Sequence, residues 1–326
     1  MKKTIVLIGM IVFFFVIPFG QTIDELLSLV NNISDLKYAQ SLSAITGISG
    51  WGTDLGGTLS LPFSISGAAT AEMTISQSLK LGMKVSNNEV GFFATFDPFA
   101  YQRAANKILY DHLNEKIKLK IKIIELFFNA FQDSRTITQL SSNGTSLKNE
   151  TEIELLKSKY TYDVQMINAI LGTQISALTF PTLDIPKIPK RYTPVFLPKP
   201  QSNNSNFSLG TSVDFMSQTK QLKLGISLNY SWNSTINKEA KSFLNVAREK
   251  YFRDIHILSQ SVRIYDNELS KLFDLYSKIY GEYLNGKSSI EDVKNISERI
   301  SSLGYERDMY CIKLIEEFYL YKAIGD

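Results

Sequence analysis

The residue types that most often do chemistry are scarce in this chain and far apart. Its 326 residues contain two histidines, His112 and His256, and one cysteine, Cys311. Neither histidine has a carboxylate or thiol at metal-ligand spacing, and the cysteine falls in a helical pattern, where a small buried apolar residue is the usual case. The sequence also lacks a phosphate-binding glycine loop, a nucleophile elbow and a Cys/His pair. We therefore expect no enzyme, no metal site and no cofactor.

The first twenty residues predict export from the cytoplasm. Lys2 and Lys3 precede an apolar run over residues 5–19, which is typical of a secretory signal peptide. No Ala-x-Ala precedes Gln21, so an uncleaved anchor is the alternative. No other stretch approaches the eighteen apolar residues of a membrane helix, so any other membrane contact must use strands or a surface helix.

The charge balance gives no support for a nucleic-acid partner. The formal net charge is +3, and removal of residues 1–20 takes away two lysines and no acid. The mature chain would then carry about +1, far from the basic excess that binds nucleic acid. With Cys311 alone, no intrachain disulfide can form.

Two regions alternate apolar and polar residues with a period of two, which is typical of strands with two different faces. In the first, residues 71–85 alternate with one break at Gln77, a turn follows at 86–88, and residues 90–96 return. In the second, residues 207–216 pair with 222–232. The polar set of the second hairpin would line a wet interior while its apolar alternates face lipid; this set is Ser208, Ser212, Asp214, Lys223, Ser227 and Asn229. Four strands cannot close a barrel alone, so this interpretation requires several copies, and a soluble sandwich is the alternative.

Long helical patterns follow each hairpin. We expect helices at about 99–139, 147–178, 235–284 and 290–324, with a shorter amphipathic helix at 22–41. A helix of some forty residues spans roughly 60 Å, which is typical of a coiled coil. Residues 43–69 are rich in Gly and Ser, with weak strand character at 58–63, and their glycines indicate turns or bulges.

The chain reads as an internal duplication joined by a proline-rich connector. The first repeat covers residues 21–180 and the second 207–326, while six prolines in the connector, 181–206, exclude helix and favour an extended segment. The turn at residues 143–150 matches the turn at 285–292 position for position. Gly144 and Gly286 are therefore predicted to end helices in the left-handed conformation.

This organisation resembles the TolC-type outer-membrane efflux factor family. The residues that carry the resemblance are the two hairpin-plus-helix units and the segment Tyr283-Leu-Asn-Gly286 followed by Ile290-Glu291-Asp292-Val293. The resemblance implies an α + β membrane protein with a duplicated β-hairpin and a long antiparallel α-helical hairpin. Three copies would form one β-barrel continued by an α-helical tunnel across the periplasm. It also implies a periplasmic adaptor protein and an inner-membrane pump as partners.

The resemblance also implies site residues at the tip of the tunnel. Asp292, together with Glu291 and Glu150, matches the acidic constriction, and Tyr283 matches a tyrosine of the closed-state lock. Asn295 and Ser288 depart from the family pattern, because a second acid and an arginine are usual there. From the residues alone, Asp292 and Glu150 can equally be acids favoured at helix N-termini. The short helix at 22–41 and the connector imply a shortened tunnel.

We expect an outer-membrane channel for efflux or type I secretion, a passive conduit gated by movement of the helical hairpins. The expected location is the outer membrane, with the helical part in the periplasm. One alternative is a non-conducting coiled-coil envelope or adhesion protein anchored in that membrane. A periplasmic adaptor is a second alternative, although two helical hairpins in tandem disfavour it. The substrate, the pump and the adaptor are not identified by the sequence.

Overall fold

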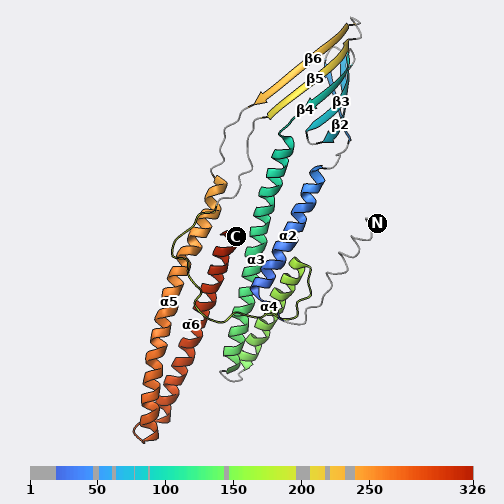
Figure 1. Cartoon of the computed structure of the whole chain (residues 1–326). Helices are drawn as coiled ribbons and strands as arrows, with labels where there is room; N and C mark the ends of the chain where they lie inside the picture. Colours follow the sequence, from blue (N-terminus) through green and yellow to red (C-terminus); the bar gives the residue numbers. More distant parts are fainter. Residues whose placement is uncertain are drawn as a thin grey trace, which may run out of the picture. The chain divides into compact units, whose positions relative to one another are not determined.

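The computed structural model describes residues 20–46, 51–60, 64–76, 78–86, 89–142, 147–195, 206–216, 221–231 and 239–325. The predicted signal peptide, except Gly20, and the predicted turn at Gly144 lie outside these residues. Five helices are described: α2 (Ile23–Thr46), α3 (Ala100–Ser142), α4 (Leu147–Leu171), α5 (Glu239–Leu284) and α6 (Ile290–Gly325) (Figure 1). Six strands are described: β1 (Trp51–Ser60), β2 (Ser64–Ser76), β3 (Leu79–Ser86), β4 (Glu89–Phe96), β5 (Asn206–Met216) and β6 (Gln221–Ser231).

The chain divides into two compact units. The helical unit holds the start of α2, α3 from Lys116, α4, the segment up to Val195, α5 from Ser242, and α6. The sheet unit holds the remainder of α2 and α3 and all six strands. Among the described residues, none of the helices is both long and apolar enough to cross a membrane.

The helical unit has one apolar core to which every one of its helices contributes. Phe127 and Phe128 of α3 are fully buried, and Phe131 stacks on Phe180 with ring centroids 4.6 Å apart. Other fully or nearly fully buried members are Ile23, Leu26, Ile123, Ile124, Ile167, Ile255, Ile312, Leu314 and Ile324. Apolar residues three and four apart fall on one helix face, so the period seen in the sequence builds this core.

Side chains near in sequence cap the N-termini of three helices. Asp97 accepts a hydrogen bond from the Phe99 N–H (3.0 Å) at the start of α3, as the Asp97-Pro98 pair predicts. At the start of α2, the Thr22 N–H donates to Glu25 Oε2 (2.8 Å) and the Glu25 N–H donates to Thr22 Oγ1 (3.4 Å). This reciprocal pair is a capping box, and α6 begins with another.

The end of α4 differs from the prediction. The helix stops at Leu171 rather than at residue 178, because Gly172 adopts a left-handed conformation with φ 63°. The Asn168 side chain then holds the chain outside the helix: its Oδ1 accepts from the Ile175 N–H (2.7 Å) and its Nδ2 donates to the Ile175 carbonyl (2.9 Å). Gly172 therefore ends α4, and the predicted end at residue 178 is wrong.

Residues beyond α4 form a short parallel bridge instead of a further helical turn. Leu178 pairs with Gln21, whose N–H donates to the Ala177 carbonyl (3.1 Å) and whose carbonyl accepts from the Thr179 N–H (2.9 Å). Because these backbone groups are used by a distant segment, they do not take part in the helix.

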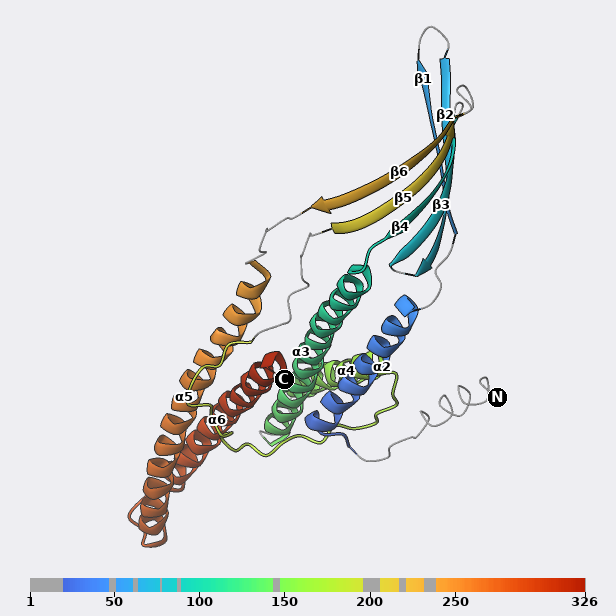
Figure 2. The same ribbon diagram turned by 45° about the horizontal axis from the view of Figure 1, so that its top comes forward.

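The six strands form one antiparallel sheet in the order β1-β2-β3-β4-β5-β6. The two predicted hairpins lie side by side, since β4 pairs with β5 from Phe96 opposite Leu209 to Glu89 opposite Met216. Figure 2 shows the strands as one twisted, curved sheet. The sheet thus joins strands from both halves of the sequence.

The prediction of a single strand at 71–85 is wrong. This stretch is the second part of β2 followed by β3, and the break at Gln77 falls between them. A bulge between Thr74 and Ser76 changes the register, so Met73 lies opposite Leu81 and both have odd numbers. The apolar alternation therefore continues through the hairpin without a change of parity, which hides the turn in the sequence.

The Gly/Ser-rich stretch contains strands rather than only turns. Residues 51–60 form β1 and residues 64–69 open β2, so the first half of the chain supplies four strands and the second half two. The two halves are therefore unequal in the sheet. The predicted helices at 99–139, 235–284 and 290–324 are confirmed to within a few residues as α3, α5 and α6.

Candidate functional site

The register of the sheet brings the predicted polar residues onto one face. Asp214 lies opposite Lys223, Ser208 opposite Asn229, and Ser212 opposite Gly225. Directly opposed residues of antiparallel strands share a face, and alternate residues of one strand do too. All six residues predicted for a barrel interior, Ser208, Ser212, Asp214, Lys223, Ser227 and Asn229, therefore occupy register positions of the same face, here called the polar face.

Strands β3 and β4 extend the polar face. Lys80 and Lys84 lie opposite Thr95 and Gly91, and Gly91 in turn lies opposite Asp214. The hydroxyl of Ser212 donates to Asp214 Oδ2 (3.1 Å). The polar face thus carries charges of both signs and hydroxyl groups. Such a surface is suited to contact with water.

Glycines on the polar face let side chains lie flat across the sheet. A Cβ at Gly82 would collide with the ring of Phe93, a Cβ at Gly91 with the Asp214 carboxylate, and a Cβ at Gly225 with the Ser212 hydroxyl. Each pair is directly opposed in the register, and all lie on the polar face. Glycine at such positions permits curvature, so the polar face is the one suited to be concave.

The opposite face is apolar and open to solvent. Ile226 is 80% exposed and Leu224 is 78% exposed, which is unusual for side chains of this size. The same face carries further exposed residues from four strands: Leu81, Met83, Val85, Val90, Phe92, Phe96, Leu209, Val213, Phe215, Leu222 and Leu228. An apolar surface of this extent marks contact with lipid or with another protein.

The turn between α5 and α6 has the predicted geometry. Gly286 has φ 67°, which confirms the left-handed prediction at this glycine. Its N–H donates to the Tyr283 carbonyl (2.9 Å), and the Lys287 N–H donates to the Glu282 carbonyl (2.9 Å). These two bonds form a Schellman motif, so Tyr283 takes part in the turn through its backbone.

Asp292 is held by the start of its own helix. Its Oδ2 accepts hydrogen bonds from the Ser289 N–H (3.0 Å), the Ser289 hydroxyl (2.6 Å) and the Ser288 hydroxyl (3.2 Å). The Asp292 N–H in turn donates to Ser289 Oγ (3.1 Å), which completes a capping box. The hydrogen bonds from Ser289, then that from Ser288, hold the pKa of Asp292 below its ordinary value.

The other two predicted constriction acids are exposed residues of first helical turns. Glu291 precedes Asp292 at the start of α6, and Glu150 lies in the first turn of α4. The helix-start interpretation of Asp292 and Glu150 therefore fits their positions within one chain. A ring of acids would form only between copies, and it stays a prediction.

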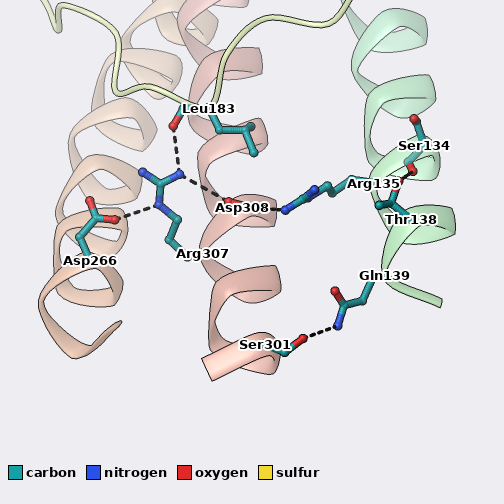
Figure 3. A network of polar contacts seen from close by, with 9 residues as sticks. All are labelled: Ser134, Arg135, Thr138, Gln139, Leu183, Asp266, Ser301, Arg307 and Asp308. Atoms are coloured by element: carbon teal, nitrogen blue, oxygen red, sulfur yellow. Dashed lines mark hydrogen bonds and ion pairs between the residues drawn. The ribbon is translucent and has the colours of Figure 1, made fainter. Parts of the chain in front are cut away.

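A partly buried polar network that the sequence analysis did not predict joins three helices (Figure 3). Arg307 of α6 donates from Nε to Asp266 of α5 (2.9 Å) and from Nη1 to the Leu183 carbonyl (3.0 Å). Its neighbour Asp308 forms an ion pair with Arg135 of α3. Asp308 is buried on the apolar face of α6. An aspartate at such a position in the sequence is the signal that could have indicated a buried ion pair.

His112 and Cys311 both pack against other side chains of the fold, which suits a structural role. His112 stacks on Tyr38 with ring centroids 4.7 Å apart, and its Nε2 lies 3.4 Å from Asp35 Oδ1. Cys311 is fully buried, and burial raises the pKa of its thiol to about 11. Its predicted role as a small buried residue is confirmed, because the thiol is kept neutral and away from solvent. Within the described ranges, no group of three or more His, Cys, Asp or Glu residues is placed to hold a metal ion.

No protein-family model and no curated protein matches this sequence. The chain is similar to the Campylobacter jejuni CmeC outer membrane channel at 10% identity, over 93% of this chain and 85% of that one, with a TM-score of 0.44. It is similar to the open state of the Neisseria gonorrhoeae MtrE outer membrane channel at 10% identity, over 93% of this chain and 88% of that one, with a TM-score of 0.41. It is also similar to the outer membrane protein VceC from Vibrio cholerae at 9% identity, over 93% of this chain and 96% of that one, with a TM-score of 0.39. These scores are low, so the proposal that follows rests on the chain's own residues.

Proposed function

We propose that this chain is the subunit of an outer-membrane channel for efflux or type I secretion. In this proposal several copies pool their sheets into one barrel, with the polar face toward water and the apolar face toward lipid. Three copies, as the family resemblance implies, would contribute six strands each. The long helices continue the barrel as a conduit in the periplasm, where an adaptor protein and an inner-membrane pump dock.

The two-faced sheet is the observation that carries the proposal. In a soluble sandwich the apolar face would pack against other parts of the chain, yet its large side chains, such as Ile226, are exposed. In lipid, every backbone group must be paired, and the outer edges of β1 and β6 have no neighbour within the described sheet. Pairing of these edges between copies satisfies both requirements at once.

The helices supply the length of a conduit. At 1.5 Å per residue, the 43 residues of α3 and the 46 residues of α5 give helices of roughly 65 and 70 Å. Transport in this proposal is passive conduction coupled to a separate pump. Asp292, with Glu291 and Glu150, would form the acidic constriction where copies meet.

The test of the barrel uses two adjacent residues on opposite faces of β6. Ile226 belongs to the apolar face and Ser227, the matched control, occupies a register position of the polar face, and both lie in the middle of β6. Arginine at a lipid-facing position near the middle of the bilayer costs about 2–4 kcal/mol per copy, whereas a water-filled interior tolerates it. We expect Ile226→Arg to abolish recovery of an oligomer from outer membranes and Ser227→Arg to preserve it, measured by native mass spectrometry. A folded monomer without detergent, or equal effects of both variants, would overturn the proposal.

The test of conduction uses planar bilayers. Clustered carboxylates attract cations, so the channel should be cation-selective and blocked by divalent cations, and Asp292→Asn should weaken the block. Anion selectivity would show that the constriction lies elsewhere. An outer-membrane oligomer without conductance would favour the coiled-coil envelope or adhesion protein instead.

A further inference from the structure

Residues 181–195, here called the strap, cross α5 and α6 without regular secondary structure of their own (Figure 1). The side chains of Leu183, Ile185, Ile188 and Tyr192 are partly buried against the core of the helical unit. The strap therefore covers part of the apolar core of the helical unit.

The end of the strap at Val195, here called the upper end, is held by the largest number of contacts, among them a hydrogen bond from Arg248 Nη2 to Thr193 Oγ1 (3.1 Å). The Asn245 side chain binds both backbone groups of Val195: its Oδ1 accepts from the N–H (2.9 Å) and its Nδ2 donates to the carbonyl (3.3 Å). The Tyr192 hydroxyl donates to the Asn245 carbonyl (3.1 Å), and Thr193 Oγ1 lies 3.1 Å from the Tyr321 hydroxyl. Several hydrogen bonds thus hold three of the four strap residues 192–195.

The lower end is fastened by one charged group. Arg307 Nη1 donates to the Leu183 carbonyl (3.0 Å), as Figure 3 shows. The same guanidinium binds Asp266 and approaches Asp308 Oδ1 at 3.4 Å. Arg307 therefore keeps carboxylate partners when the carbonyl leaves, so the cost of opening this end is small.

A third contact, here called the middle fastening, lies between the two ends, where His256 Nε2 is 3.2 Å from the Pro189 carbonyl. The strap holds four prolines, at 181, 186, 189 and 194, which have no N–H and keep a detached strap stiff. Local opening of such a segment requires less free energy than unfolding of the helices on which it lies.

We propose that the strap is a latch on the α5–α6 hairpin that opens at its Arg307 end while its Asn245 end stays fastened. Closed, the strap adds a link between α5, through Asn245 and His256, and α6, through Arg307. Open, the strap keeps its contacts with α5 and loses the one with Arg307, while the Arg307–Asp266 and Asp308–Arg135 pairs remain. The proposal does not depend on the channel function and can fail separately from it.

Limited trypsin digestion of the full chain in detergent tests the latch, because the strap carries its own cleavage sites. Lys187 lies between the lower and middle fastenings, Lys190 and Arg191 lie between the middle and upper ones, and all three are exposed. We expect cleavage after Lys187 to be at least tenfold faster than after Arg191. Arg307→Gln should raise the rate at Lys187 about tenfold and leave Arg191 unchanged, whereas Asn245→Ala should raise the rate at Arg191. Arg299→Gln, an exposed arginine of the same helix, is the matched control.

Urea separates opening of the latch from unfolding of the chain. Local opening exposes little surface, so the rate at Lys187 should hardly change with urea below the unfolding midpoint. If Arg307→Gln fails to fold, Arg307→Lys, which keeps the charge and loses the guanidinium fork, should still raise the Lys187 rate several-fold. Cleavage that follows the globally unfolded fraction, or equal acceleration at both sites, would overturn the proposal.

Discussion

Large apolar side chains are buried in the helical unit but exposed on one face of the sheet unit. In the helical unit Phe128 is fully buried by helices of the same chain, whereas Phe92 of β4 is 61% exposed. Burial of apolar side chains is the main favourable term in folding, so the first unit completes its core and the second does not. The comparison indicates that the sheet needs an apolar environment from outside the chain.

Glycine shows the same contrast. In the sheet, Gly82, Gly91 and Gly225 make room for the side chains opposite them. In the helical unit, Gly172 and Gly286 have positive φ and open space where a Cβ would stand. The first use concerns packing across strands and the second concerns backbone conformation, so substitutions should separate them.

Truncation of a phenylalanine should distinguish the two units most strongly. Phe128→Ala should lower the free energy of unfolding by about 3–5 kcal/mol, because it leaves a cavity in a packed core. Phe92→Ala should cost less than about 1 kcal/mol in detergent, since its ring faces the surroundings. Urea unfolding followed by circular dichroism measures both. Equal losses would mean that the apolar face of the sheet is covered within the chain.

A larger side chain at Gly82 should strain the sheet. Gly82→Val should cost about 1–3 kcal/mol, because the new methyl groups take the place of the Phe93 ring. Phe93→Ala in the same chain should recover part of this loss, and a double-mutant cycle measures the coupling. Additive effects would show that the ring does not lie over this glycine.

Substitution of Gly286 should act through the backbone alone. Gly286→Val should destabilise by about 1–2 kcal/mol, since a left-handed conformation is costly for a residue with Cβ. Gly281→Ala, in the helical part of α5 with open space around it, should instead stabilise by up to about 1 kcal/mol. Thermal unfolding of the pair checks the prediction, and a loss at both glycines would contradict it.

The smallest expected effect concerns a buried acid of the helical unit. Burial raises the pKa of Glu317, Lys313 opposes this, and Glu316 adds to it. Because the folded pKa lies above the unfolded one, its contribution to stability is complete below the unfolded pKa and is lost as the pH rises through the folded value. Glu317→Gln should therefore gain stability relative to the native chain between acidic and neutral pH.

Glu298, which is exposed beside Lys294, provides the control for this titration. A Glu317→Gln variant with the same pH dependence as the native chain would show that this carboxyl titrates normally.

Much of the local structure could be predicted from particular residues. Asp97-Pro98 and Asn285-Gly286 mark a helix start and a helix end at the right places, because capping and left-handed glycine are local effects. The alternation of residues 222–231 predicts the two faces of β6. The end of α4 was missed, since Gly172 acts together with Asn168, Ile175 and the distant Gln21.

The sequence by itself determined the long helices and the two faces of β5 and β6, because these follow from spacing along the chain. Tertiary structure alone decided the hairpin inside residues 71–85, since the bulge at Thr74 keeps the parity of both strands the same. It also decided the pairing of β4 with β5 and the network of Arg135, Asp308 and Arg307. Partners such as Arg135 and Asp308 are 173 positions apart. Their contact depends on how helices pack, which no local pattern records.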